Sequence, residues 1–235
     1  MSPFIGEFIG TALLITMGGG VVANVLLNKT KGNNSGWIII TFGWAMAVFI
    51  GVFASTHFGG SGHLNPAVTI ALASFGDFDT SLVATYIGAQ FAGAIAGSIV
   101  VWLAYKQHFD ETTDNNLKLA VFCTAPAIRN PLYNLITEII GTFVLMFGAL
   151  SMSKNTEALG TLNALPVGLL VLAIGISLGG PTGYAINPAR DLGPRIAHFI
   201  LPIPAKRDSD WGYSLIPVVG PIIGALIAAG IFKYL

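Results

Sequence analysis

The sequence predicts an all-α membrane protein with six transmembrane helices and two re-entrant half-helices arranged as an inverted repeat. Three observations carry this prediction: the composition, six long apolar segments, and a short Asn-Pro-Ala box in each half of the chain. Apolar residues make up 54% of the 235 residues and charged residues 9%, whereas a typical soluble domain is about 25% charged. So few charges could not cover the surface of a soluble protein of this size.

The same composition excludes several kinds of function. Eleven basic and eleven acidic residues give a net charge of zero, so the chain has no basic field for nucleic acid. The single cysteine, Cys123, excludes an internal disulfide and a cysteine-based zinc site. Because no His/Asp/Glu cluster has metal-ligand spacing and no nucleophile–base set is visible, we expect no metal, no cofactor and no enzyme activity.

Six segments reach the roughly 20 apolar residues that a membrane-spanning helix needs. They are residues 4–27, 37–56, 82–105, 132–152, 162–179 and 213–235. Two shorter apolar segments, 65–75 and 187–201, cannot cross a bilayer alone and are expected to be re-entrant or interfacial. No basic region precedes the first segment, so it is expected to be a retained span rather than a signal peptide.

The two halves of the chain match each other in four elements. Residues 7–11 (EFIGT) recur as 138–142 (EIIGT) at an offset of 131. The same offset relates Gly93-Ala94 to Gly224-Ala225, and an offset of 122 relates the box Asn65-Pro66-Ala67 to Asn187-Pro188-Ala189. We therefore expect one channel domain over 1–235, with a first repeat at 1–105, a loop at 106–130 and a second repeat at 131–235. Three spans per repeat is an odd number, so the second repeat enters the membrane from the opposite side.

Each Asn-Pro-Ala box predicts the start of a helix, because Asn is a favoured N-cap and Pro a favoured first helical residue. Residues 65–75 would cover about 16 Å at about 1.5 Å per residue, roughly half of the hydrocarbon thickness. In an inverted repeat two such half-helices meet near the midplane with their N-termini. There the positive dipole ends and two Asn amides offer hydrogen bonds to water or hydroxyl oxygens and oppose cations and protons. The alternative is that each Asn only caps its helix.

With the boxes in the contexts 62–69 (GHLNPAVT) and 187–194 (NPARDLGP), the chain resembles the major intrinsic protein family, the aquaporins and aquaglyceroporins, over essentially its whole length. Asp191 after Arg190 resembles the glycerol-facilitator branch, and the short termini resemble bacterial members. The resemblance implies an aquaporin-like right-handed bundle around one pore. It also implies a homotetramer in the plasma membrane with cytoplasmic termini.

The resemblance further implies a selectivity filter of four positions. Arg190 matches the pore arginine, and the alternative reading is a partner for Asp191 alone. Tyr184 matches a position often held by Phe in glycerol channels, and its hydroxyl is expected to make the constriction more polar. Gly175 matches a position where water channels carry His, so its missing side chain is expected to widen the pore. The alternative for Gly175 is helix packing in a glycine-rich span.

The aromatic residue of the second span is predicted to be Phe42, because Phe42-Gly43 resembles the aromatic-glycine pair of glycerol channels. Trp44 is the alternative. An aromatic wall opposite Arg190 would suit a polyol, whose CH groups lie on the ring while its hydroxyls face the donors.

Several residues are expected to support the pore. Glu7 and Glu138 are ionisable groups inside spans and are costly there without partners; the resemblance implies that each accepts hydrogen bonds from the loop before the box in its own half. Asp191 is also expected to have a structural supporting role. His63 is expected to bond the loop backbone, with gating as a second reading. Residues 106–129 carry mixed charge and are expected to form an exposed loop that caps the pore mouth.

Cytoplasmic termini conflict with the positive-inside rule, which predicts the reverse orientation. Seven basic residues would lie outside, namely Lys29, Lys31, Lys106, Lys118, Arg129, Lys206 and Arg207. Only Lys154 and Lys233 would lie inside.

The sequence thus predicts a passive channel for glycerol and other small uncharged solutes, with water, that excludes protons and ions. Its expected partners are these solutes, the lipid bilayer and further copies of the chain. Neutral lactic acid, urea or dihydroxyacetone are alternative main solutes. Other classes left open are a proton-coupled secondary transporter that uses Glu7 and Glu138, and a structural, junction-forming membrane protein.

Overall fold

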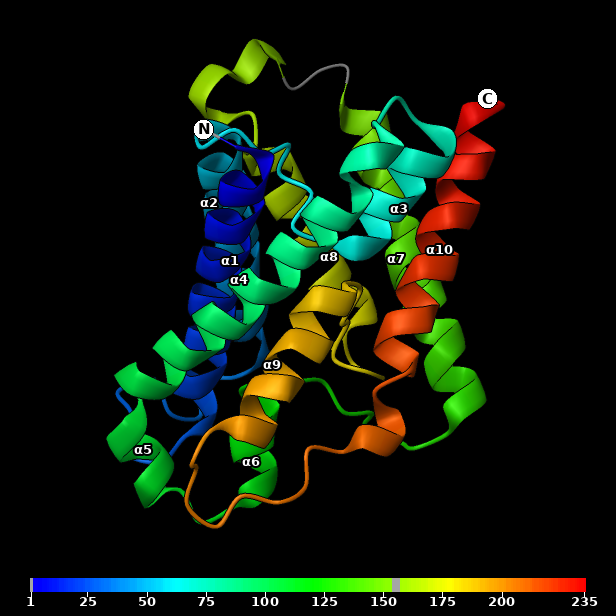
Figure 1. The fold of residues 1–235 in the computed structure, drawn as a ribbon. Helices are drawn as coiled ribbons and strands as arrows, with labels where there is room; N and C mark the ends of the chain where they lie inside the picture. Colours follow the sequence, from blue (N-terminus) through cyan, green and yellow to red (C-terminus); the bar gives the residue numbers. More distant parts are fainter. Residues whose placement is uncertain (1, 154–156) are drawn as a thin grey trace.

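The computed structural model describes residues 2–153 and 157–235, and over these ranges the chain is helical without strands (Figure 1). Lys154 lies outside the described residues. The long helices are α1 (Pro3–Leu26), α2 (Trp37–His57), α4 (Val83–Ala104), α7 (Pro131–Ser153), α8 (Leu165–Leu178) and α10 (Ile216–Lys233). Short 3-10 turns, η1 (Thr80–Leu82), η2 (Glu157–Leu162) and η3 (Trp211–Tyr213), precede α4, α8 and α10. Together they form six apolar segments of 20 to 25 residues, long enough to cross a membrane, which confirms the six predicted spans.

The two half-helices are α3 (Pro66–Phe75) and α9 (Pro188–Ile200). Both chain termini lie at one end of the bundle, which we call the terminal end (Figure 1). The short helices α5 (Lys106–Glu111) and α6 (Asn115–Ala120) and the segment 201–213 lie at the other, the loop end. From the middle of the bundle, α3 runs toward the terminal end and α9 toward the loop end, as an inverted repeat requires.

The same close helix contact occurs in both halves. A Cβ atom on Gly93 in α4 would lie 2.4 Å from the carbonyl oxygen of Phe8 in α1. In the second half, a Cβ on Gly224 in α10 would lie 2.3 Å from the carbonyl oxygen of Ile139 in α7. Only glycine permits helix backbones to approach so closely. Both contacts join residues related by the sequence offset of 131, so the repeat extends to packing.

The segment between the repeats is not the exposed loop that its charges suggested. Phe109, Leu119 and Phe122 are buried in it, and Phe109 and Phe122 pack into the core that also contains Leu27 of the α1 C-terminus. Lys118 is only 2% exposed, and its ammonium group donates to the carbonyl of Pro204 at 2.6 Å. The prediction was wrong because apolar side chains between the charges turn inward and make this segment a packed cap.

Candidate solute pore

The two half-helices meet through their Asn side chains in the middle of the bundle. The Asn65 amide donates to the carbonyl of Ile186 at 2.8 Å. The Asn187 amide donates to the carbonyl of Leu64, also at 2.8 Å. Each box therefore completes the loop that leads to the other box, and the two N-termini touch as the inverted repeat predicts.

The same two side chains also cap their helices. The Asn65 oxygen accepts from the backbone N–H of Ala67 at 2.9 Å, and the Asn187 oxygen accepts from the N–H groups of Ala189 and Arg190 at 2.9 and 3.2 Å. Capping fixes which way each amide faces. Since an Asn amide carries two N–H donors and the cross-bond uses one, a second donor on each Asn is left for a solute. The reading of the two Asn residues as helix caps alone is therefore too narrow.

Glu7 holds the loop before the first box. It is fully buried, and its Oε1 accepts from the backbone N–H of His63 and the hydroxyl of Ser55, both at 3.0 Å. Its Oε2 accepts from the N–H of Leu64 and the amide of Gln90, both at 2.8 Å. Four donors surround this carboxylate, so its buried charge is compensated.

Glu138 holds the loop before the second box in the same way. Its two oxygens accept from the backbone N–H groups of Ala185 at 3.0 Å and Ile186 at 2.8 Å. Both loops contain non-glycine residues in the left-handed region, with φ of +51° at Leu64, +38° at Tyr184 and +44° at Ile186. Such residues persist only where surrounding contacts over-determine them. The carboxylates supply those contacts, as the resemblance implied.

Gln90 was missed by the sequence reasoning. Its amide joins Glu7 to the hydroxyl of Thr69 on α3, at 2.8 and 3.0 Å. The available signal was a polar amide in the middle of an apolar span. The repeat offset offered no help, because the equivalent position in the second half is Pro221.

A cavity of about 160 Å³ is lined by residues of both boxes. Asn65, Asn187 and Arg190 contribute polar groups to its wall, together with the loop backbones that lead to the boxes. Its apolar wall includes Leu14, Val48, Val52, Leu145 and Val171. Among the described residues, no donor reaches the carbonyl oxygens of Gly62, His63, Tyr184 or Ala185, so these loops leave acceptors beside the Asn donors.

Arg190 faces this cavity without a protein acceptor. Its guanidinium lies 4.1 Å from the centre of the Trp44 ring, a cation–π distance, and no hydrogen bond from it reaches another described residue. Asp191 instead pairs with Arg195 at 2.7 Å and accepts from Thr124. The alternative that Arg190 serves only as a partner for Asp191 is therefore wrong.

The structure corrects the aromatic residue of the second span. Phe42 is 52% exposed on the outside of the bundle, whereas Trp44 is 4% exposed and lines the cavity. Residues two apart on an α-helix point in nearly opposite directions, because each residue turns the helix by about 100°. Gly43 packs against Val21 of α1, so the aromatic-glycine pair marks a helix contact here and not the pore.

The Tyr184 hydroxyl does not make the pore wall more polar, contrary to the expectation. Tyr184 lines the cavity, but its hydroxyl oxygen is buried without a partner among the described residues. A Cβ on Gly175 would lie 2.9 Å from Cζ of Tyr184 and 3.1 Å from its hydroxyl oxygen. The hydroxyl end of the ring thus fills the space above Gly175, in agreement with the packing reading of this glycine. Gly175 itself does not line the cavity, and its effect on pore width stays a prediction.

Tyr184→Phe is expected to leave the glycerol-to-water permeability ratio within about twofold of the parent and to preserve or raise stability. The reason is that a buried hydroxyl without a partner costs about 1–3 kcal/mol, and phenylalanine removes it while keeping the ring. Stopped-flow light scattering on proteoliposomes and thermal unfolding in detergent measure the two quantities. A large change in the ratio would place the hydroxyl in the solute path.

His63 bonds a side chain and not the loop backbone that was expected. Its ring Nδ1 lies 3.1 Å from the hydroxyl of Thr69 on α3. The rings of Phe78 and Tyr86 pack against it at 4.7 and 5.0 Å. His63 is half-buried and lines the cavity.

A polar network at the loop end braces the segment that carries Arg190. Buried Arg195 donates to Asp191, to the carbonyl of Thr124 at 3.0 Å, and to the carbonyls of Ser209 and Asp210 at 2.7 and 3.0 Å. Thr124 donates to Asp191 through its N–H and its hydroxyl, both at 2.7 Å. Sequence reasoning did not single out Arg195 or Thr124.

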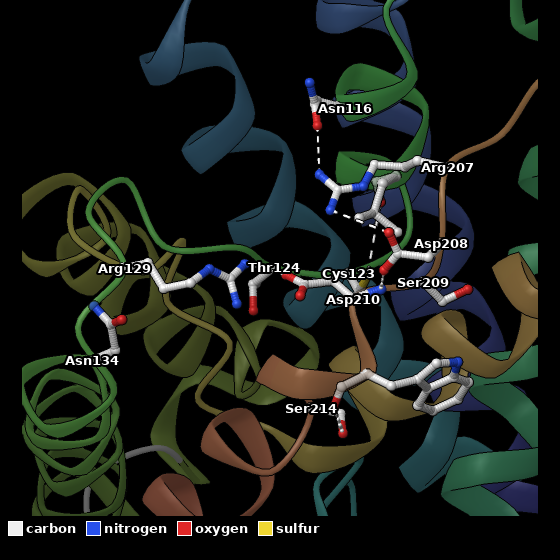
Figure 2. Close-up of polar contacts among 12 residues, drawn as sticks. Asn116, Cys123, Thr124, Arg129, Asn134, Arg207, Asp208, Ser209, Asp210 and Ser214 are labelled. Atoms are coloured by element: carbon white, nitrogen blue, oxygen red, sulfur yellow. Dashed lines mark hydrogen bonds and ion pairs between the residues drawn. The ribbon is translucent and has the colours of Figure 1, made fainter.

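Figure 2 shows the periphery of this network. Arg129 reaches Asp210 at 2.5 Å, and Arg207 reaches Asn116 at 2.6 Å. The segments 116–130 and 207–210 are thus joined to each other and, through Arg195, to α9.

The comparisons with known proteins agree with this architecture. The family described as "Major intrinsic protein" matches residues 1–232. A "Probable glycerol uptake facilitator protein" of Thermotoga maritima is 57% identical over 235 residues and 100% of both chains. A "D/L-lactic acid transporter" of Lactiplantibacillus plantarum is 43% identical over 96% of this chain and 94% of its own.

A solved structure is also similar. The aquaglyceroporin from Plasmodium falciparum superposes with a TM-score of 0.86 at 31% identity, covering 98% of this chain and 94% of its own. The structure has two Asn-capped half-helices that touch within a bundle of six spans, and the family model matches this chain over nearly its whole length. The chain belongs to the major intrinsic protein family.

Proposed function

We propose that the protein is a passive channel for glycerol and other small uncharged solutes, with water. The observation that carries the proposal is the cavity at the two boxes, whose lining combines hydrogen-bonding groups of Asn65, Asn187 and Arg190 with many apolar side chains. A polyol has the same mixed character, because it carries both hydroxyl groups and apolar CH groups.

Solutes pass by exchanging hydrogen bonds with water for hydrogen bonds with the wall. Hydroxyl oxygens accept from Arg190 and from the free N–H groups of Asn65 and Asn187, while hydroxyl hydrogens are donated to the loop carbonyls. The ring of Trp44 supports the CH groups beside Arg190. Because the half-helix N-termini and Arg190 all present positive potential, they oppose the passage of cations and protons.

Proton-coupled transport by Glu7 and Glu138 is the less favoured reading. Neither carboxylate lines the cavity. Both carboxylates accept hydrogen bonds from the backbone N–H groups of the loops before the boxes, so they stabilise these loops. The similarity to a lactic acid transporter supports undissociated lactic acid as a second solute, since this acid carries a hydroxyl and a carboxyl group that bond as glycerol hydroxyls do.

We further propose a multi-pass protein of the plasma membrane with its terminal end in the cytoplasm, assembled as a homotetramer of single-domain chains. Apolar side chains such as Ile38 and Phe42 are exposed on the outside of the bundle, which suits lipid or a neighbouring copy.

Uptake by proteoliposomes tests the proposal with a panel of water, glycerol, urea and undissociated lactic acid. We expect rapid reswelling after a glycerol gradient relative to protein-free liposomes, and equal glycerol concentrations at equilibrium. Absence of glycerol flux would refute the proposal. Accumulation above equilibrium under a pH gradient would instead identify a proton-coupled transporter.

Trp44→Ala is expected to raise the permeability to a five-carbon polyol by about threefold or more, because the ring narrows the cavity beside Arg190. Phe42→Ala is the matched control, since it removes an aromatic ring from the outside of the same helix. The same reswelling assay with polyols of increasing length measures both variants. An equal effect of the two changes would contradict the placement of Trp44.

A further inference from the structure

The ring of His63 has a hydrogen-bonding role that its neighbours determine. His63 lies on the loop from the terminal end to the first box and lines the cavity. One ring nitrogen, Nδ1, contacts the hydroxyl of Thr69. No described residue donates to or accepts from the other nitrogen, Nε2. What Nε2 can offer a solute depends on which nitrogen carries the hydrogen of the neutral ring.

The hydroxyl of Thr69 decides this question. It has one hydrogen, which it donates to the carbonyl oxygen of Asn65 at 3.1 Å, as a threonine does to the residue four positions earlier in a helix. It also receives a hydrogen from the Gln90 amide at 3.0 Å. The orientation of that amide is fixed, since its nitrogen also faces the carboxylate of Glu7 at 2.8 Å, which can only accept.

With its hydrogen committed to Asn65, the Thr69 hydroxyl can only accept from His63. The hydrogen of the neutral ring must therefore be on Nδ1, and Nε2 carries a lone pair. We propose that Nε2 of His63 is a hydrogen-bond acceptor for solute hydroxyls in the half of the cavity nearer the terminal end. This inference rests on the proposed polyol channel and adds a binding residue to it.

The proposed acceptor complements the rest of the wall. Arg190 and the free amide groups of Asn65 and Asn187 are all donors, so a hydroxyl that accepts from them must place its own hydrogen elsewhere. The backbone carbonyls of the loops before the boxes can accept it. Nε2 supplies an acceptor that belongs to a side chain, on a ring held in place by Thr69, Phe78 and Tyr86.

Magic-angle-spinning NMR of the full-length protein in liposomes, with ¹⁵N-labelled histidine, tests the assignment. The chain has four histidines, and His63→Phe identifies the His63 signals by their disappearance. We expect Nδ1 to be protonated, Nε2 to be bare, and glycerol addition to shift Nε2 of His63 alone. A protonated Nε2, or a bare Nε2 that glycerol does not shift, would overturn the proposal.

Two variants extend the test. Thr69→Val removes the acceptor at constant shape and is expected to produce a mixture of the two tautomers. His63→Phe is expected to slow glycerol roughly two- to tenfold, the effect of one hydrogen bond. The control is His57→Phe, the same replacement at an exposed histidine that does not line the cavity. Unchanged glycerol flux in His63→Phe would contradict the proposal that Nε2 accepts a hydrogen bond from the solute. Failure of the whole polyol proposal is distinguishable, because the unaltered protein would then pass no glycerol whatever its tautomer.

Discussion

Gly175→Leu is expected to lower glycerol permeability about tenfold or more and water permeability less, because the pore diameter sets the barrier for the larger solute. A Cβ on Gly175 would lie 2.9 Å from Tyr184 Cζ, so the Tyr184 ring must move. Trp37 stands edge-on to that ring at 5.9 Å, and Gly179 lies so close that a Cβ there would be 2.4 Å from Tyr184 Cδ1. We therefore expect the ring to move into the cavity, which it already lines.

Stopped-flow measurements of glycerol and water flux in proteoliposomes check this prediction. Gly180→Leu is the matched control, because a Cβ at Gly180 meets nothing within 4 Å. The double variant Gly175→Leu, Tyr184→Ala should recover glycerol flux, since alanine at position 184 frees the space that the displaced ring would occupy in the cavity. If Gly175→Leu leaves the glycerol-to-water ratio unchanged, the assignment of this pair to the filter is wrong.

Glu138→Leu is expected to destabilise the protein by roughly 2 to 6 kcal/mol, since two buried N–H groups lose their acceptor at about 1–3 kcal/mol each. The affected groups belong to Ala185 and Ile186, next to the second box. Glycerol flux should fall with stability, because the loop that positions Asn187 loses its brace. Thermal unfolding in detergent and flux per folded channel are the measurements.

The matched control for this change is Glu111→Gln. Glu111 pairs with Lys29, but both side chains are more than half exposed, so the loss should be below about 1 kcal/mol. A Glu138→Leu protein that keeps its stability and its equilibrative flux would contradict the bracing role. Loss of pH-driven uptake alone would indicate proton coupling.

Much of the fold was predictable because each signal is local. Span length and hydropathy indicate the six helices, and the Asn-Pro pairs predict where α3 and α9 begin. The two Asn residues followed from the paired Asn-Pro-Ala boxes of the repeat and Arg190 from the family resemblance, and the structure places all three at one cavity.

The errors concern the direction of single side chains. The helix α2 is apolar on every side, so the sequence carries no amphipathic phase to decide between Phe42 and Trp44. The direction of the Tyr184 hydroxyl depends on the left-handed backbone of its loop and on the space above Gly175. Gln90 finds its partner Glu7 83 positions away in the chain, a contact that no local pattern encodes.

The reciprocal bonds between Asn65 and Ile186 and between Asn187 and Leu64 have a consequence for biosynthesis. When the first three spans have left the ribosome, the residues that complete their loop have not yet been made. Until then the Leu64 carbonyl and the Asn65 amide lack their final hydrogen-bond partners, and lipid cannot replace these partners. Closure of the pore is thus a late event, which requires the nascent second half to insert and dock before either loop acquires its final shape.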